Sequence, residues 1–185
     1  MHEYLKDALD DVSLPGSEHC IDLMCQHWEL VKRWNLRSNL TAVDDDRRSA
    51  WLHYRDSLQA LAYLPKGSIL DIGSGAGFPG IALAIAQPQR TITLLEPKRK
   101  KASFLRIAAA RLGLANVRVL EARIQDVPDT LYDAATSRAT FSQNADLQLC
   151  LNWLRLGAVF IAFRANSSTP LPNSKRYPYR LADNA

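Results

Sequence analysis

The chain has 185 residues, and its 23 lysines and arginines against 19 aspartates and glutamates give a formal charge of +4. This length and a hydrophobic content of 47% predict one globular unit and exclude a disordered or fibrous chain. The longest apolar stretches, such as residues 81–86, are far shorter than the roughly 20 residues that cross a bilayer. Residues 1–6 lack the basic and apolar regions of a secretory signal. We therefore expect neither a membrane protein nor a secreted one.

The cysteines indicate the cellular compartment, and the charge distribution indicates the kind of partner. Cys20, Cys25 and Cys150 are odd in number and show no zinc-binding spacing, and the histidines show none either. Buried thiols, no metal site and a cytoplasmic protein are the expectation. Residues 1–30 carry a net charge of −6 and residues 31–185 a net charge of +10. Such asymmetry indicates a polyanionic partner for the larger part.

The first part of the chain has the pattern of helices. Apolar residues recur every three or four positions from Ile21 to Trp34, and Ser17 is the predicted N-cap. A polar turn is predicted at residues 39–41, and residues 44–46 can cap a second long helix. The tryptophans of both helices are expected to pack in the core.

From Ser68 onward, short apolar runs alternate with amphipathic stretches. Strands are predicted at residues 69–72, 91–95, 117–120, 133–136 and 158–163. Helices are predicted at residues 81–86, 100–112 and 145–154. Strands without polar alternation are buried on both faces, which requires helices on both sides of a parallel sheet.

This pattern predicts a doubly wound, mostly parallel α/β fold with a helical cap at its N-terminus. The cap is expected over residues 1–64, the sheet domain over 65–165 and an irregular tail over 166–185. Right-handed crossovers place the loops after the strands along one edge, where ligands bind.

A glycine-rich loop with the sequence DIGSGAGFPG spans residues 71–80, between the first predicted strand and its helix. A dinucleotide loop has its third glycine at the position of Phe78, whereas here it is Gly77. The resulting G-x-G-x-G pattern resembles motif I of class I S-adenosylmethionine-dependent methyltransferases, which have a Rossmann-like fold. The preceding Asp71 suits a sulfonium cofactor better than a pyrophosphate, and Glu96 after the second strand can hold both ribose hydroxyls.

The wider pattern resembles the RsmG (GidB) family, bacterial methyltransferases acting on N7 of a guanine (guanine 527 in the family) in 16S ribosomal RNA. The matching pieces follow the family's order over roughly residues 28–140. They are Trp34-Asn35, residues 39–43 (NLTAV), 53–57 (HYRDS), 71–80, 94–96 (LLE), Lys100-Lys101 with 104–106 (FLR), 122–124 (ARI) and 137–139 (SRA).

The resemblance implies S-adenosyl-L-methionine as cofactor, S-adenosyl-L-homocysteine as product and small-subunit ribosomal RNA or the subunit as partner; we expect a monomer. The expected cofactor residues are Asp71, Gly73, Gly75, Gly77, Phe78, Glu96, Ile124, Gln125 and Arg138. The expected catalytic residues are Arg138, Arg123 and Asn39. The expected RNA-binding residues are Lys98, Arg99, Lys100, Lys101 and Arg106.

Elementary chemistry is compatible with these roles. Guanine N7 has a free lone pair, so its attack on a methyl sulfonium needs no general base, and alignment carries the catalysis. No nucleophilic cysteine or poised His/Asp pair is expected at the active edge. Arginine can donate two hydrogen bonds to the O6 edge of guanine or to phosphate. Cations at a helix N-terminus are unfavourable, so four basic residues at 98–101 favour phosphate binding there.

The sequence departs from the family at two places. Three other functions stay open. The strand predicted at residues 158–163 ends in Phe163-Arg164-Ala165 instead of a Leu-Lys-Gly-like sequence, and the family's closing strand is not evident. A non-catalytic RNA-binding or ribosome-assembly factor on the same scaffold is therefore an alternative. A NAD-dependent oxidoreductase is disfavoured by Phe78, and methyl transfer to a small molecule by the basic excess of residues 31–185.

Overall fold

The computed structural model describes residues 1–126, 131–138, 150–164 and 174–179. Its centre is a five-stranded sheet of order β3-β2-β1-β4-β5, in which every neighbouring pair is parallel. The strands are β1 (Ile69–Ile72), β2 (Ile92–Leu95), β3 (Val117–Leu120), β4 (Tyr132–Arg138) and β5 (Leu154–Phe163). The chain winds outward from β1 first to one edge and then to the other, so the predicted doubly wound parallel fold is confirmed.

The register aligns the ends of the strands. One row of paired residues across the sheet is Leu120, Leu95, Ile72 and Ser137. The residues that come next along each strand direction are Glu121, Glu96, Gly73 and Arg138. Because all strands run the same way, these positions form one edge of the sheet, and the loops that leave it can converge.

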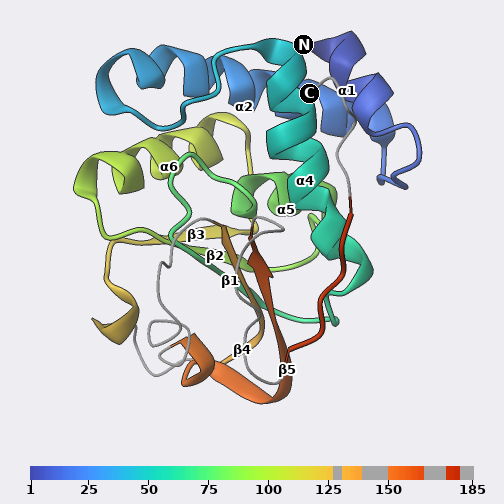
Figure 1. Ribbon diagram of the computed structural model, residues 1–185. Helices are drawn as coiled ribbons and strands as arrows, with labels where there is room; N and C mark the ends of the chain where they lie inside the picture. Colours follow the sequence, from blue (N-terminus) through green and yellow to red (C-terminus); the bar gives the residue numbers. More distant parts are fainter. Residues whose placement is uncertain (127–130, 139–149, 165–173, 180–185) are drawn as a thin grey trace.

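Helices α5 and α6 of the sheet domain lie on one face of the sheet. α5 (Gly80–Ala86) and α6 (Arg99–Arg111) follow β1 and β2, and right-handed crossovers place both on the same side. All seven residues of α5 are buried, since α5 lies between the sheet and the cap. Figure 1 shows α5, α6 and the cap helices on this side, with the short η3 (Ile124–Asp126) toward the other side.

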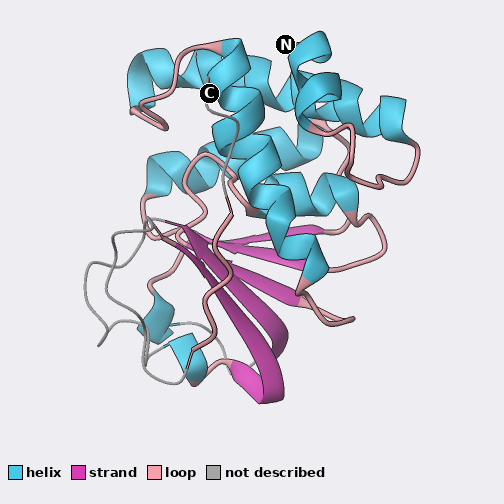
Figure 2. Ribbon diagram, turned by 45° about the vertical axis from the view of Figure 1, so that its right-hand side comes forward, coloured by secondary structure: helices cyan, strands magenta, loops and turns pink. Residues whose placement is uncertain are grey.

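The N-terminal part forms a helical cap that packs above α5 and α6 (Figure 2). Its elements are α1 (His2–Ala8), α2 (Ser17–Ser38), α3 (Asp46–Ser49), the π-helical η1 (Ala50–Arg55), α4 (Asp56–Leu58) and the 3-10 helix η2 (Gln59–Ala62). The hydrophobic core continues from the cap through α5 to the sheet. The division at residues 64 and 165 therefore stays a prediction.

Several local predictions can be compared with the structure. Asp45 caps the second helix, because its side chain accepts a hydrogen bond from the Arg48 N–H at 2.7 Å. Ser17 is not an N-cap: it is the first residue of α2, and Gly16 occupies the cap position in a left-handed conformation. Trp28 is buried as expected. None of the helices in the described ranges is long and apolar enough to span a bilayer.

The predicted helix over residues 145–154 is wrong at its C-terminal end. Leu154 is the first residue of β5 and pairs with Tyr132, so the strand is longer than its apolar core suggested. Residues 145–149 lie outside the described part of the chain, as does Ala165 of the altered strand end. None of the three cysteines forms a disulfide; Cys20 and Cys150 are buried, and Cys25 is half-buried.

One buried histidine joins the cap to the glycine loop. The imidazole of His27, on α2, lies 3.0 Å from the Ala76 carbonyl oxygen through Nε2 and 2.9 Å from the Tyr54 hydroxyl through Nδ1. Burial lowers the pKa of His27 to about 3, so the ring is neutral. A neutral ring can donate from Nε2 to the Ala76 carbonyl, while the Tyr54 hydroxyl donates to the Met24 carbonyl at 2.9 Å. The loop is therefore held from the cap side by a neutral hydrogen-bond pair.

Candidate active site

The glycine loop opens toward the ligand edge at two positions. Gly73, Gly75 and Gly77 have φ angles of 75°, 55° and 93°, a conformation that side chains rarely adopt. Within residues 71–80, Gly73 and Gly75 are half-buried and the other eight residues are buried. A Cβ atom at Gly75 would come no closer than 3.7 Å to other atoms, to the Gly73 carbonyl oxygen. The backbone at Gly75 is therefore the part of the loop that a ligand can approach closely.

Gly77 and Phe78 face inward instead. A Cβ atom at Gly77 would lie 2.7 Å from Ile81 Cδ1 and 3.1 Å from His27 Nε2, so packing requires a glycine there. The Phe78 ring is 4% exposed and stacks on His53 with ring centroids 4.5 Å apart. Both residues were predicted to contact the cofactor, and the structure places their side-chain positions against the cap, because the chain turns there to enter α5.

Asp71 also lies beneath the loop, and its role in binding the cofactor stays a prediction. Its carboxylate has no solvent exposure and accepts hydrogen bonds from the Gly80 N–H at 3.1 Å and the Thr136 hydroxyl at 2.9 Å. Burial raises the pKa of Asp71 to about 6, although the hydrogen-bond donors oppose this shift. In this arrangement Asp71 organises the loop from below.

Glu96 lies where the sequence placed it, against the glycine loop. Its Oε2 accepts a hydrogen bond from the Gly75 N–H at 3.0 Å, and its Oε1 accepts one from the Lys98 N–H at 2.9 Å. A carboxylate has about four acceptor positions, so these two bonds leave capacity for further donors such as ribose hydroxyls. The two regions predicted to bind the cofactor, the glycine loop and Glu96, are thus joined by the hydrogen bond from the Gly75 N–H.

The residues after β3 reach the same edge. Arg123 and Gln125 are exposed, and Ile124 is half-buried against the cluster formed by Leu70 and Ile72 on the far face of the sheet. An apolar side chain can contact the flat face of a nucleobase, and a neighbouring exposed amide can hydrogen-bond its polar edge. The cofactor roles of Ile124 and Gln125 and the catalytic role of Arg123 stay predictions.

Arg138 ends β4 and turns toward the cap. Its guanidinium donates to the Leu52 carbonyl at 3.0 Å and to Asp56 Oδ2 at 3.3 Å, and lies 3.4 Å from His53 Nδ1. Its carbon Cζ stands 5.2 Å from the centre of the Phe78 ring. The Arg138 side chain is 18% exposed. It joins the sheet edge, the glycine loop and the cap.

A histidine and an aspartate of the cap meet at Arg138, and the expectation that no poised His/Asp pair acts at this edge stays a prediction. His53 and Asp56 both contact Arg138, and both come from the helical stretch in which η1 makes a wide π-helical turn. Burial, and then the charge of Arg138, lower the pKa of His53 to about 3, so the imidazole is neutral. π-Helical turns are frequent at functional sites, but no periodic pattern of residues marks them.

Asn39 lies at the cap side of this cluster. It is exposed, ends α2 and adopts a left-handed conformation with φ of 44°. The turn that follows is fixed by Asn35, whose side chain hydrogen-bonds the backbone of Leu40 and Thr41. The Thr41 hydroxyl then meets His53 Nε2 at 2.8 Å. The catalytic role expected for Asn39 is not tested by this geometry.

The basic turn lies next to Glu96. Lys98, Arg99 and Lys100 are exposed and Lys101 is half-buried at the start of α6. Arg106 differs from the expected phosphate ligand, because its guanidinium pairs with Glu121 at 2.9 Å. Glu121 thereby opposes the charge of Arg106. The four residues of the turn, 98–101, remain the stronger candidates for phosphate binding.

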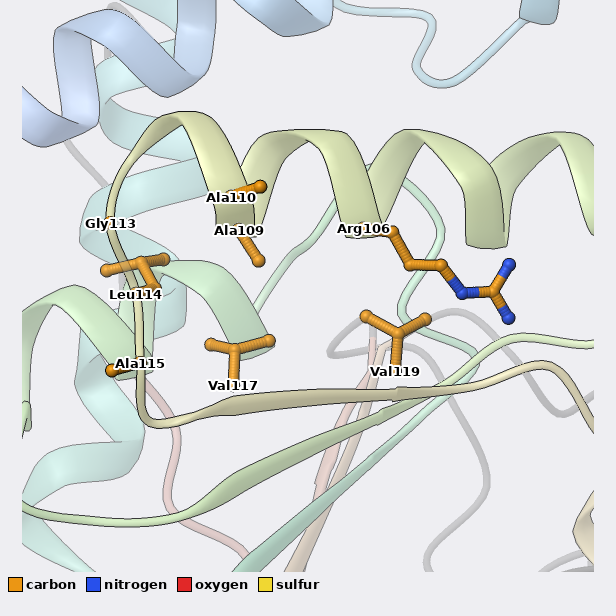
Figure 3. Close-up of a pocket in the computed structure, with 8 residues that line it drawn as sticks. All are labelled: Arg106, Ala109, Ala110, Gly113, Leu114, Ala115, Val117 and Val119. Carbon is orange, nitrogen blue, oxygen red and sulfur yellow. The ribbon is translucent and has the colours of Figure 1, made fainter.

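A groove in the described structure lies away from the glycine loop. It lies between α6 and the edge strand β3, has a volume of about 480 Å³ and is walled by small and apolar residues (Figure 3). Arg106 supplies its charged rim, and Figure 3 shows this side chain extending away from the apolar wall. The glycine loop contributes nothing to this groove. In the described part of the chain, no three His, Cys, Asp or Glu side chains gather as a metal site.

Comparisons with known proteins agree with this geometry. A family model described as rRNA small subunit methyltransferase G (GidB) matches residues 21–175. The chain is 32% identical to the Ribosomal RNA small subunit methyltransferase G of Clostridium beijerinckii over 174 residues, 90% of this chain and 73% of that protein. It is 44% identical to the Neisseria gonorrhoeae protein of the same name over 131 residues, 70% of this chain and 63% of that protein.

The fold is shared with solved methyltransferases. The structure of a SAM-dependent methyltransferase from Aquifex aeolicus has a TM-score of 0.55 and 22% identity, covering 73% of this chain and 78% of that chain. The parallel sheet and the glycine loop are those of a class I S-adenosylmethionine-dependent methyltransferase. Within this class, the chain belongs to the rRNA small subunit methyltransferase G family.

The resemblance drawn from the sequence is thus confirmed, and it makes S-adenosyl-L-methionine the cofactor and S-adenosyl-L-homocysteine the product. The residues present fit this group. The open backbone at Gly75 leaves room for close approach, and the adjacent Glu96 carboxylate retains acceptor capacity for hydroxyl donors. A NAD-dependent oxidoreductase is no longer an alternative.

The buried carboxylate predicts a characteristic pH dependence for Asp71→Asn. Folded Asp71 keeps its proton up to about pH 6 and unfolded Asp71 only to about 3.8, so the wild type loses stability as the pH rises through this interval. The asparagine variant lacks this loss. Its free energy of unfolding relative to the wild type should rise by on the order of 3 kcal/mol between pH 4 and pH 7, measured by urea denaturation.

Asp133→Asn is the matched control with the opposite sign. The Ser68 N–H and Arg155 hold the pKa of Asp133 below its usual value, so this carboxylate stabilises the folded state as the pH rises. A pH-independent difference between wild type and Asp71→Asn contradicts the assignment.

Glu96→Gln should weaken binding of S-adenosyl-L-methionine by about 10- to 100-fold, because hydrogen bonds to a charged acceptor are lost. Isothermal titration calorimetry measures the affinity directly. Glu121→Gln is the control, since Glu121 follows β3 as Glu96 follows β2 but pairs with Arg106. Equal affinities for the two variants would show that Glu96 does not hold the cofactor.

Proposed function

We propose that this protein transfers the methyl group of S-adenosyl-L-methionine to N7 of a guanine in small-subunit ribosomal RNA, guanine 527 in the family. The observation that carries the proposal is the family match over residues 21–175, together with relatives named for ribosomal RNA methylation. We further propose that it acts as a monomer in the cytoplasm.

The charge of the site edge supports an RNA substrate. Four consecutive basic residues, 98–101, begin two residues after Glu96, which contacts the glycine loop, and three of them are exposed. Arg123 is exposed at the next strand end. Phosphate contacts from such residues position an RNA without reading its sequence. They lie on the edge where the target base must meet the methyl donor.

The chemistry of N7 suits what this chain provides. The bound cofactor supplies an electrophilic methyl group, and the lone pair of N7 attacks it without loss of a proton. The residues therefore have to bind and align, which is consistent with a neutral His53 and an Asp56 carboxylate that is paired with Arg138. Methylation of an exocyclic amine would need a proton acceptor at the reacting nitrogen.

A modification map tests the proposal. Ribosomal RNA from cells with and without the gene is compared by reduction and aniline cleavage, which breaks the chain at N7-methylguanine. Purified protein is then incubated with labelled S-adenosyl-L-methionine and either naked 16S ribosomal RNA or assembled small subunits. Label on one guanine supports the proposal. Cofactor binding without methyl transfer to either substrate favours the non-catalytic RNA-binding or assembly factor.

Arg138→Ala should lower the rate of methyl transfer at least 100-fold while S-adenosyl-L-methionine still binds. Removal of the guanidinium leaves Asp56 without its cation and loosens the cap from the sheet edge, so a lower melting temperature is also expected. Arg138→Lys keeps the charge but cannot make the same set of hydrogen bonds. Unchanged turnover in both variants would remove Arg138 from the site.

The double variant Lys100→Ala with Lys101→Ala should bind ribosomal RNA more weakly and with a smaller dependence on salt. Each lost phosphate contact lowers the slope of log K against log salt by about one. Arg111→Ala, an exposed base at the other end of α6, is the control. An identical slope in the double variant and the wild type would count against the basic turn.

A further inference from the structure

The described tail segment, residues 174–179, returns from the sheet to the cap (Figure 1). It has no helix or strand, and its two tyrosines contact the cap. The ring of Tyr177 lies against that of Tyr63, just after η2, with centroids 4.4 Å apart and planes inclined by 35°. The hydroxyl of Tyr179 donates to Asp56 Oδ1. This irregular segment is therefore attached to the cap at the carboxylate that holds Arg138.

The attached segment leaves aromatic surface in solvent. Tyr63, Tyr177 and Tyr179 are 43%, 52% and 46% exposed, and they are three of the four exposed tyrosines among the described residues. The fourth, Tyr4, lies on α1 in the acidic N-terminal part of the chain. A tyrosine pair that only served packing would bury its rings, as Tyr54 does in the cap.

The charge around these rings is positive. Lys175 and Arg176 precede Tyr177 and are exposed, and Lys66 is exposed three residues after Tyr63. Residues 174–179 contain no acidic residue. Asp56, which the segment contacts, has its charge opposed by Arg138 at 3.3 Å. Exposed aromatic rings beside cations are the means by which proteins bind unpaired nucleotides, through stacking and phosphate contacts.

The tail segment lies close to Arg138 at the active edge. Asp56 accepts a hydrogen bond from Arg138 through Oδ2 and from Tyr179 through Oδ1, so a single carboxylate separates the tail segment from the active edge. The basic turn at residues 98–101 follows β2, whereas the tail segment follows β5, at the opposite edge of the sheet. If an RNA strand places its target base near Arg138, the nucleotides on one side of that base would lie toward the basic turn. Those on the other side would lie toward the tail segment.

We propose that Tyr63 and Tyr177, with Lys175 and Arg176, form a stacking platform for an unpaired nucleotide that flanks the target base. The inference rests on the proposed function for its RNA substrate and adds a binding surface outside the cofactor loop and the basic turn. It requires that the RNA be single-stranded where it meets these rings, since a paired base does not offer its face.

Binding of an unstructured single-stranded RNA oligonucleotide and of a duplex of equal length, at one fixed salt concentration, tests the platform. Tyr177→Ala should bind the single strand about 5- to 150-fold more weakly, as expected for one lost stacking contact, and the duplex as the wild type does. Tyr177→Phe, which keeps the ring, should stay within about twofold of the wild type. Tyr4→Ala, a control of equal exposure to Tyr63, should change neither affinity.

Two further measurements separate stacking from folding and from the proposed activity. S-adenosyl-L-methionine affinity and melting temperature should be the same in Tyr177→Ala and Tyr177→Phe, and Tyr63→Leu should repeat the loss of single-strand binding. With ribosomal RNA as substrate, Tyr177→Ala should raise KM and leave kcat unchanged. A wild type that shows Tyr177-dependent single-strand binding but no methyl transfer refutes the proposed function and retains the platform.

Three results would overturn the platform. Equal single-strand affinity of Tyr177→Ala and Tyr4→Ala shows that the ring does not stack on RNA. An equal loss of single-strand and duplex binding assigns the effect to charge. If Tyr177→Ala binds naked 16S ribosomal RNA normally but loses assembled subunits, the surface contacts a ribosomal protein instead.

Discussion

The carboxylate of Asp71 has no solvent exposure, and its two oxygens accept hydrogen bonds from different elements of the sheet domain. One bond comes from the Gly80 N–H at the start of α5 and the other from the Thr136 hydroxyl on β4. β1, β4 and α5 are thereby fixed to each other beneath the glycine loop. A Cβ atom at Gly80 would lie 2.5 Å from Asp71 Oδ2, so the close contact also explains that glycine. The open backbone at Gly75 depends on this arrangement below it.

The cap completes the site from the other side. His27 holds the loop at Ala76, and the π-helical turn of η1 directs the Leu52 carbonyl and His53 toward Arg138. Both histidines are neutral, because burial lowers their pKa values to about 3. The single cation in this group of contacts is the guanidinium of Arg138, opposed by Asp56. The site is thus arranged to hold and align its ligands, which suits the proposed methylation of guanine N7, a nitrogen that needs no proton acceptor.

Much of this arrangement could be predicted from the sequence, and the reasons are physical. The bounds of β1 and β3 follow from short apolar runs, and the meeting of Glu96 with Gly75 follows from parallel strands ending at one edge. The inward direction of Phe78 could not be predicted, because it depends on contacts with a separate helix. The pairing of Arg138 with Asp56 joins residues 82 positions apart and has no periodic signature. The sequence therefore located the edge of the site and missed how the cap closes it.

Asp56 is the point at which the sheet edge, the cap and the tail segment meet. Its carboxylate accepts from Arg138 and from Tyr179, and burial together with this carboxylate keeps the pKa of the Tyr179 phenol above its usual value. The phenol is therefore a donor at any pH at which the fold persists, and the carboxylate charge is compensated by one cation. A polyanion approaching the tail segment meets Lys175 and Arg176 in solvent and no unopposed charge from Asp56. An acidic residue beside the proposed RNA-binding edge is compatible with that proposal, because its charge is paired with that of the arginine it holds.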